Sequence, residues 1–269
     1  MSIKPNQIGL QLYTVREYLT DEKTAMTMLN EVRNIGYETI QLCNSPFDAK
    51  FYKNAMDEFG FTICGMDAPM AKMQNDLDGV IENCKILGNS YITGSFNTYK
   101  FGTENHGAQS DLADDMDKFI RDICIIGEKL KGTGVSFAYH NHSFEFAVEN
   151  GKSFLEDFYD RTKNAGILAE IDTYWVQHGG GSPQDWIYKL AGRIPILHLK
   201  DMLIQFNEKT EVVQKFAPVG SGNMHWEPVI QAGEQTGVKW FVVEQDTFDK
   251  PSLECAKDSF DYLTKLING

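Results

Sequence analysis

Four segments in the second half of the chain end in side chains that can bind a metal ion. Each is a short apolar run closed by His, Asp or Glu, and the four are VSFAYHNH (135–142), GILAEID (166–172), PILHLKD (195–201) and KWFVVEQD (239–246). If these runs are parallel strands of a barrel, their ends share one rim, where His140, Asp172, His198 and Glu244 form one site. Imidazole nitrogen mixed with carboxylate oxygen suits Mn²⁺, Zn²⁺, Co²⁺ or Fe²⁺ more than Ca²⁺. We therefore expect one divalent ion, and the ligand types alone do not select among these four.

The run AYHNH places two histidines at one strand end. Residues two apart in an extended segment face the same side, so His140 and His142 are both expected to point to the barrel mouth. The simpler interpretation is two surface histidines on a loop. We favour the barrel mouth because the chain has only six histidines and two of them lie together here.

Asp172 and His198 each have a structural interpretation beside the functional one. Asp172 follows an apolar run, where an Asp commonly caps a helix, and Glu170 shares its parity, so that one of the two is expected to point inward. His198 lies between leucines, where a lone His is often a satisfied core residue. Lys200 shares its face, however, and this makes HLKD a polar cluster at the end of a buried strand.

Glu244 is the most informative single residue. It follows four apolar residues, and burying an unpaired carboxylate there is costly, so it needs a cation, a metal or water nearby. Gln245 and Asp246 add further oxygen ligands or hydrogen-bond partners. The sequence contains no HExxH, P-loop or GxSxG motif.

Strand-like runs alternate with amphipathic, helix-like stretches along the chain. Eight strands with a helix after most of them is the count for a closed barrel, so the predicted fold class is α/β, a single (β/α)8 TIM barrel over residues 1–269. The expected strands lie at 7–14, 39–44, 61–67, 89–95, 135–142, 167–172, 196–201 and 240–246. The expected helices include 24–37, 111–134 and 258–267.

A doubly wound sheet is the competing architecture, and it would usually carry a Gly-rich phosphate turn after its first strand. Here the first strand runs into LQLYTVRE without a GxGxxG motif. No Pro-, Gly- or Ser-rich linker and no charge block divides the chain, so we assign one domain. HGGGSP (178–183) and VGSGN (219–223) are expected to be loops.

The composition limits the classes of partner. A net charge of −13 opposes binding to a phosphate backbone, so no nucleic-acid partner is expected. The five cysteines show no CxxC pair, which favours reduced, mostly buried thiols. The start MSIKPNQIG lacks an apolar signal core and no apolar run approaches the ~20 residues that span a membrane, so we expect a cytoplasmic protein without a membrane partner. A leader removed before expression would leave no trace in this sequence.

The chain resembles the sugar phosphate isomerase/epimerase family, the xylose isomerase-like barrels. The resemblance is carried, in order, by GLQLYTVRE (9–17), AYHNHSFEF (138–146), EIDTYW (170–175), GRIPILHLKD (192–201), VGSGNMHW (219–226) and FVVEQD (241–246). These motifs span nearly the whole chain and are specific for the superfamily, but they do not specify a substrate. The resemblance implies a metal-dependent carbohydrate enzyme and allows a homodimer.

In that superfamily the ends of strands five to eight usually give Glu, Asp, His and Glu to one divalent metal. Asp172, His198 and Glu244 match the last three positions. At the first position this chain has His140 instead of Glu, and Glu145, five residues on, is the alternative source of a carboxylate. We take His140 as the first ligand.

Relatives that isomerise or epimerise ketoses remove and return an α-proton through a metal-stabilised enediolate, with two carboxylates on opposite faces of the substrate. The resemblance therefore implies an isomerase or epimerase acting on a keto sugar or sugar derivative, with Glu244 as one proton-transfer group. His142, Glu145 and Lys200 are the candidates for the other. Because His replaces one carboxylate, an elimination from a 3-keto-glycoside or a dehydration at the same site is the alternative.

The expected ligand is a small carbohydrate. No Gly-rich anion turn or Arg cluster stands out, although Arg193 and Lys200 could together hold one anionic group, so a neutral sugar is at least as well supported as a phosphate. The aromatic residues suited to stacking on sugar rings are Tyr13, Tyr174, Trp175 and Trp226. Ordinary packing is the alternative for all four.

Two rival functions follow from the same residues. A DNA-repair endonuclease of the superfamily would need more metal ligands, a basic surface and, by resemblance, a His three residues after Asp172, where this chain has Trp175. A non-catalytic sugar- or metal-binding barrel is the second rival, and the replacement at His140 is its best support. Metal analysis followed by proton exchange into keto sugars distinguishes a binder from an enzyme.

Overall fold

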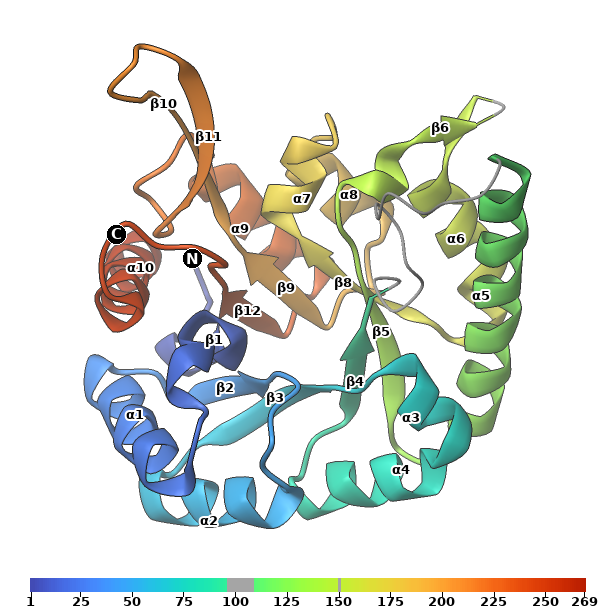
Figure 1. Cartoon of the computed structure of the whole chain (residues 1–269), viewed down its shortest axis with the longest axis horizontal. Coiled ribbons are helices and arrows are strands. Elements are labelled where there is room, and N and C mark those ends of the chain that lie inside the picture. Colours follow the sequence, from blue (N-terminus) through green and yellow to red (C-terminus); the bar gives the residue numbers. More distant parts are fainter. Residues whose placement is uncertain (96–108, 150) are drawn as a thin grey trace.

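The computed structural model of the protein describes residues 1–95, 109–149 and 151–269; in the helix that begins at Gln109, side chains are described from residue 115 onward. Within these ranges eight parallel strands form a closed barrel, and helices pack around its outside (Figure 1). Around the barrel the strand order is β1-β12-β9-β8-β5-β4-β3-β2. The predicted (β/α)8 barrel is therefore confirmed.

Each barrel strand lies inside one of the eight predicted runs. The strands are shorter than most of the runs, because the last residues of several runs belong to the loops above the rim. The strands are β1 (Ile8–Gln11), β2 (Thr39–Leu42), β3 (Thr62–Asp67), β4 (Tyr91–Gly94), β5 (Ser136–His140), β8 (Leu168–Asp172), β9 (Ile196–Leu199) and β12 (Trp240–Val243).

The helices predicted at 24–37, 111–134 and 258–267 correspond to α1, α5 and α10. Helix α1 begins where the Asp21 carboxylate accepts a hydrogen bond from the Thr24 N–H at 3.0 Å, and it ends at Gly36, whose φ of 124° suits glycine. The helices are α1 (Glu22–Ile35), α2 (Ala49–Phe59), α3 (Met70–Asn75), α4 (Leu77–Ile86), α5 (Gln109–Leu130), α6 (Phe154–Thr162), α7 (Thr173–His178), α8 (Pro183–Lys189), α9 (Trp226–Thr236) and α10 (Ser252–Asn268).

Two antiparallel hairpins stand outside the barrel and were not predicted. β6 (Val148–Glu149) pairs with β7 (Lys152–Ser153), and β10 (Asp201–Phe206) pairs with β11 (Val212–Ala217). The second hairpin projects from the barrel beside α7 and α9 (Figure 1). The expected loop at 219–223 follows it directly, and the expected loop at 178–183 joins α7 to α8.

The inward side chains change from apolar to polar along the barrel axis. Cys64, Ile196 and Val242 form a small apolar cluster of buried side chains that belong to β3, β9 and β12. Two residues further along their strands come His198 and Glu244, which face the same way because side chains alternate along a strand. The apolar cluster is thus the layer beneath the polar rim.

All five cysteines are free thiols. Within the described residues, no helix combines the length and apolar character needed to cross a membrane.

Candidate metal centre

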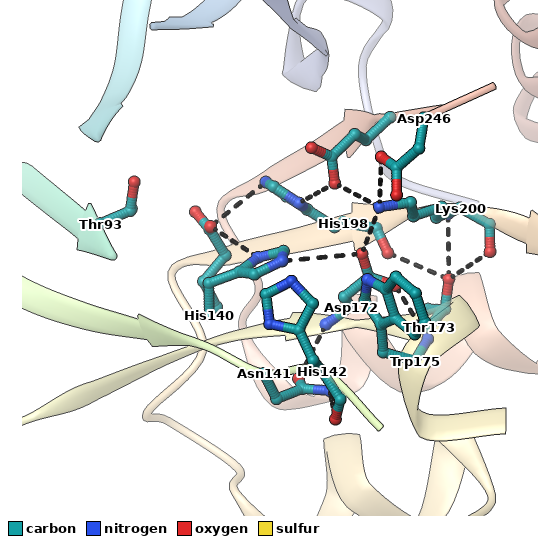
Figure 2. A network of polar contacts seen from close by, with 12 residues as sticks. Thr93, His140, Asn141, His142, Asp172, Thr173, Trp175, His198, Lys200 and Asp246 are labelled. Carbon is teal, nitrogen blue, oxygen red and sulfur yellow. Dashed lines mark hydrogen bonds and ion pairs between the residues drawn. The ribbon is translucent and has the colours of Figure 1, made fainter. Parts of the chain in front are cut away.

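The four predicted ligands meet at the carboxyl end of the barrel. His140, Asp172, His198 and Glu244 each offer one ligand atom, and these atoms all lie within 4.8 Å of one another. Figure 2 shows His140, Asp172 and His198 turned toward a common centre. Three of the four residues are buried and His140 is partly exposed.

Strand register explains why residues far apart in the sequence converge here. Asp172 on β8 pairs directly with His198 on β9, and His140 on β5 pairs with Glu170 on β8. Val242 on β12 pairs with His198. Glu244 lies two residues beyond Val242, so it comes to the same side of the sheet slightly nearer the rim.

His198 is held through both ring nitrogens. Its Nδ1 lies 3.0 Å from Glu244 Oε2, and its Nε2 lies 2.8 Å from Gln41 Oε1. Because an amide oxygen can only accept, Nε2 donates to Gln41, while a protonated Nδ1 donates to Glu244; Nδ1 is the nitrogen that would bind a metal after losing its proton. Gln41, on β2, was not predicted; the signal was a polar amide within the otherwise apolar run TIQLC.

His140 is oriented in the same manner by Glu170. Its Nδ1 lies 3.1 Å from Glu170 Oε1, and its Nε2 faces Asp172 Oδ2 at 3.9 Å. Glu170 Oε2 accepts a hydrogen bond from Gln41 Nε2 at 2.6 Å. Glu170 and Asp172 therefore both point inward, where we expected only one of them to do so, and Glu170 orients the ligands from behind.

Lys200 is a buried cation beside this cluster. Its Nζ lies 3.1 Å from Glu244 Oε2, 3.4 Å from Asp172 Oδ2 and 2.8 Å from Asp246 Oδ1. Only 2% of its surface is exposed. Burying an ammonium group is costly unless it is paired, and three carboxylates pair it here.

The charges set the ionisation of the cluster. Burial raises the pKa of Asp172 to about 6, against the lowering effects of Lys200 and His140. Burial alone would raise the pKa of Glu244, but the charges of Lys200 and His198 hold it well below its usual range. Burial opposes a charge on His140, and the contact with Glu170 outweighs it and raises the pKa of His140 to about 9.

The donor set fits a divalent ion. Asp172 Oδ1 caps α7 by accepting from the Trp175 N–H at 3.1 Å, so the helix-cap interpretation of this residue is correct as well. Its other oxygen, Oδ2, is buried and accepts no hydrogen bond, and its nearest cation is Lys200 Nζ at 3.4 Å, so it has room for a further cation. The full donor set, two imidazoles and two carboxylates, suits Mn²⁺, Zn²⁺, Co²⁺ or Fe²⁺.

Glu145, the alternative first ligand, is turned away from this centre. It is fully buried, its Oε1 accepts from the Tyr139 hydroxyl at 2.7 Å, and its Oε2 accepts from the His142 N–H at 2.9 Å. Burial raises the pKa of Glu145 to about 7. This carboxylate fixes the loop after β5, and His140 is the residue that lies in the cluster.

His142 and Trp175 lie next to each other at the edge of the site. Their ring centroids are 5.3 Å apart, and the buried atoms His142 Nδ1 and Trp175 Nε1 have no hydrogen-bond partner. Burial, together with the charges of His140 and Lys200, lowers the pKa of His142 well below its usual range. His142 is thus a neutral side chain behind His140.

Tyr13 and Trp226, two more of the residues predicted to stack on a sugar, differ in exposure. Tyr13 is 41% exposed, with the Arg16 guanidinium 4.0 Å above its ring. Trp226 is 1% exposed and its Nε1 donates to Asp201 Oδ2 at 2.8 Å, so the prediction that it stacks on a sugar is wrong. It is a core residue that anchors the start of α9.

The prediction for Arg193 is also wrong. Its guanidinium donates to the backbone carbonyls of Tyr159 and Ile167 at 3.1 and 2.8 Å. Arg193 precedes β9, so it lies at the amino end of that strand, whereas the candidate site lies at the carboxyl end. It ties the loops at the base of the barrel together and does not reach a ligand.

A cavity of about 440 Å³ opens beside the cluster. His140, Glu170, His198 and Glu244 form one wall. The rest of the lining comes from the first four barrel strands and the segments after them, together with Phe137 on β5, and consists of Gln11, Asn44, Asp67, Ala68, Pro69, Met70, Met73, Gly94, Ser95 and Phe137. A small polar molecule in this space would contact the proposed ligands directly. Asp67 was not among the residues predicted from the sequence.

The fold and the site place the chain among the xylose isomerase-like TIM barrels. The family profile with that description matches residues 29–266, and the protein belongs to this family. None of the curated protein sequences matches the chain at a significant level.

Solved structures show the same fold. A sugar phosphate isomerase/epimerase from Parabacteroides distasonis ATCC 8503 is 21% identical, with a TM-score of 0.76 over 97% of this chain and 94% of that chain. A xylose isomerase-like TIM barrel protein from Mycobacterium smegmatis in complex with magnesium is 11% identical, with a TM-score of 0.70 over 97% and 96%. An L-ribulose 3-epimerase is 13% identical, with a TM-score of 0.70 over 97% and 94%.

Proposed function

We propose that the protein is a divalent-metal-dependent isomerase or epimerase that acts on a keto sugar or sugar derivative by moving an α-proton. The observation that carries this proposal is the cluster of four ligand atoms, all within 4.8 Å of one another, from His140, Asp172, His198 and Glu244. Three of these residues also line the cavity, so a ligand there would lie against them. The magnesium complex of the Mycobacterium smegmatis relative supports the choice of a metal site.

The residues divide into ligands, groups that orient them and a proton-transfer group. A divalent ion held by the four ligands would polarise the carbonyl and neighbouring hydroxyl of the sugar and so acidify the α-proton. Glu244, which lines the cavity, is the carboxylate that takes that proton. Lys200 Nζ donates to Glu244 Oε2 at 3.1 Å and fixes its direction. Lys200 is a positioning residue, because it does not line the cavity.

Elimination at the same site is the second candidate. The observation that favours it is His140, which stands where many relatives have a carboxylate and which is fixed by Glu170 at 3.1 Å. Both reactions begin with removal of an α-proton, so they diverge only in whether the proton returns or a β-substituent leaves.

Metal content by mass spectrometry is the first test. We expect near-stoichiometric divalent metal in the wild type and clear loss in Glu244→Gln, with the exposed Glu227→Gln on α9 as the matched control that keeps its metal. Equal metal in wild type and Glu244→Gln, or none in either, would overturn the metal site.

Proton exchange is the second test. The metal-loaded protein is incubated in D₂O with a panel of keto sugars, and deuterium incorporation, new sugars and elimination products are followed by NMR. Incorporation with a new sugar supports the isomerase or epimerase, and loss of a β-substituent supports the lyase. Sugar binding without any of these reactions would show a non-catalytic sugar-binding barrel.

A further inference from the structure

We propose that Asp67, on β3, is the second proton-transfer residue of this site and acts on the face of the sugar opposite Glu244. This inference rests on the proposed function. The role of second proton-transfer group has no occupant on β5, because His140 stands where many relatives have a carboxylate. Three observations carry it: the place of Asp67 in the barrel, the lining of the cavity and the hydrogen bonds that hold Asp67.

The barrel topology puts Asp67 across the cavity from the cluster. In the closed strand order, β3 stands four strands from β9 in either direction and three strands from β12. Asp67 is the last residue of β3, so it lies at the carboxyl rim like the ligands. Asp67, His198 and Glu244 line the same cavity of about 440 Å³. A sugar in that cavity would lie between Asp67 and Glu244.

The other candidates for the second group do not face this cavity. Among the described residues, its ionisable lining consists of Asp67, His140, Glu170, His198 and Glu244. His142, Glu145 and Lys200, the three side chains that the sequence suggested, are absent from that lining. Glu145 and Lys200 are bound on all sides by the contacts described above.

Glu170 does line the cavity, but its carboxylate is already engaged. Oε2 accepts from Gln41 Nε2 at 2.6 Å, and Oε1 lies 3.1 Å from His140 Nδ1 and 3.4 Å from His198 Nε2. Moving a proton through this carboxylate would break the contacts that orient both histidines. Asp67 is the remaining carboxylate of the lining. It is not one of the four proposed metal ligands, and it does not orient any of them.

Asp67 is held in a fixed direction and keeps one oxygen for a ligand. The Thr93 hydroxyl donates to Oδ1, and Thr93 Oγ1 in turn accepts from Gln41 Nε2 at 3.2 Å. Among the described residues, no hydrogen-bond partner is recorded for the other oxygen, Oδ2. Burial and the charge of Glu170 raise the pKa of Asp67 to about 7, which suits a group that gives and takes protons near neutral pH.

The proton balance of the step is simple. The Glu244 carboxylate takes the α-proton, the C–H bond breaks, and its electron pair moves toward the carbonyl oxygen to give an enediolate. The carboxylic acid of Asp67 then delivers its proton to the opposite face of the same carbon, where a new C–H bond forms. The product is the epimer, and Glu244 and Asp67 have exchanged protonation states, which solvent restores. No oxidant or reductant is required.

The test uses the full chain loaded with Mn²⁺ and two unphosphorylated ketoses, L-ribulose and D-tagatose, in D₂O. The variant is Asp67→Asn, with Asp67→Glu as the conservative variant and the exposed Asp78→Asn as the matched control. NMR follows deuterium at C3 of the starting sugar separately from formation of the C3 epimer. Metal content and thermal unfolding of each variant show whether it is folded and loaded.

We expect wild type and Asp78→Asn to exchange C3 and to form the epimer. Asp67→Asn should keep its Mn²⁺ and keep exchanging C3 on the Glu244 face, while epimer formation falls by about 10²-fold or more. Asp67→Glu should restore part of the epimer formation. Exchange without inversion is a result that a merely structural role would not give.

Three results would overturn the proposal. If Asp67→Asn forms the epimer at the wild-type rate, Asp67 is not the proton donor. If the folded, Mn²⁺-loaded Asp67→Asn loses exchange and epimer formation equally, the residue acts in another way. If the Mn²⁺-loaded wild type neither exchanges nor epimerises either sugar while Asp67→Asn leaves the binding of both sugars unchanged, the proposed function falls and the role of Asp67 falls with it.

Discussion

His198 donates from Nε2 to Gln41 Oε1 across 2.8 Å, and both side chains are buried. The Gln41 amide cannot turn over without losing its donations to Glu170 and Thr93, at 2.6 and 3.2 Å. The bond therefore fixes the tautomer of His198 and leaves Nδ1 toward Glu244. Partners of this kind behind a metal ligand commonly change metal affinity by 10–100-fold when they are removed.

Replacement of Gln41 should weaken metal binding without unfolding the barrel. In Gln41→Leu, His198 is free to place its hydrogen on either nitrogen, so we expect Mn²⁺ affinity to fall by about 10–100-fold. Titration calorimetry with Mn²⁺ measures this. Thr39→Val, on the same strand and equally buried, is the control that should bind Mn²⁺ as the wild type does. Unchanged affinity in Gln41→Leu would show that the amide does not orient the ligand.

Lys200 should contribute most to stability when no divalent metal is added. Lys200→Met leaves Glu244, Asp172 and Asp246 without their common cation, and breaking a buried pair costs about 3–5 kcal/mol. Urea unfolding in EDTA measures the loss, and Mn²⁺ should stabilise the variant by more than it stabilises the wild type. Lys215→Met removes an exposed pair with Asp249 and should cost less than about 1 kcal/mol. Equal losses for the two variants would contradict this view of Lys200.

The raised pKa of Glu145 should make the free energy of unfolding depend on pH. Its pKa is about 7 in the folded protein, raised by burial from an ordinary 4.5. Between these values the folded state keeps a proton that the unfolded state has lost, so this group lowers the free energy of unfolding as the pH rises from about 4.5 to about 7. The interval corresponds to a change on the order of 3 kcal/mol.

Glu145→Gln should remove that part of the pH dependence. We expect its free energy of unfolding, measured in urea at several pH values, to fall less than that of the wild type between pH 4.5 and 7. The variant should also retain its divalent metal, because Glu145 lies outside the ligand cluster. Parallel pH profiles of variant and wild type, or loss of metal, would refute the assignment. Exposed Glu149→Gln is the matched control.

The barrel and the cluster of four candidate ligands could be predicted because both follow from local pattern. Each ligand stands at or just after the end of an apolar run, and parallel strands bring such ends to one rim. The place of His140 in the cluster is local as well, since its parity places it inward while Glu145 lies in the turn after β5. The remaining features depend on which strands become neighbours and which face each other.

Gln41 and Asp67 lie on early strands, where nothing in the local sequence shows that they face His198 and Glu244 across the barrel. Arg193 and Trp226 carry functional residue types in familiar motifs, but their partners are backbone carbonyls and a buried carboxylate. The hairpin β10–β11 was missed because neither of its strands, DMLIQF and VVQKFA, alternates apolar with polar residues.

Replacement of Asp201, the last residue of HLKD, should lower the stability of the protein without loss of metal. Its carboxylate accepts from the N–H groups of Gly220, Gly222 and Met224 at 2.8, 3.1 and 3.3 Å, and from Trp226. A hydrogen bond to a charged group contributes about 1.5–3 kcal/mol, so Asp201→Asn should lower the free energy of unfolding by at least that amount. Mn²⁺ binding should stay near wild type. A variant as stable as the wild type would contradict the anchoring role.

The charges around the cavity predict that the sugar carries no phosphate. Asp67, Glu170 and Glu244 line the cavity, and among the described residues its lining contains neither Lys nor Arg. Lys200 is already paired with three carboxylates, and Arg16 donates to the backbone carbonyls of Tyr13 and Asp246. The cationic side chains of the described lining, His140 and His198, belong to the metal cluster, so a phosphate ester, with about −1.5 to −2 charges at neutral pH, would meet three carboxylates and no further cation there.

Binding of D-tagatose and D-tagatose 6-phosphate to the Mn²⁺-loaded protein tests that prediction. We expect the neutral sugar to bind at least about tenfold more tightly, which corresponds to about 1.4 kcal/mol. Asn44→Lys places a cation at the exposed end of the cavity lining and should narrow the difference, while leaving the affinity for the neutral sugar nearly unchanged. Tighter binding of the phosphate ester by the wild type would show that a cation outside the described lining reaches the cavity, and the substrate class would then be a sugar phosphate.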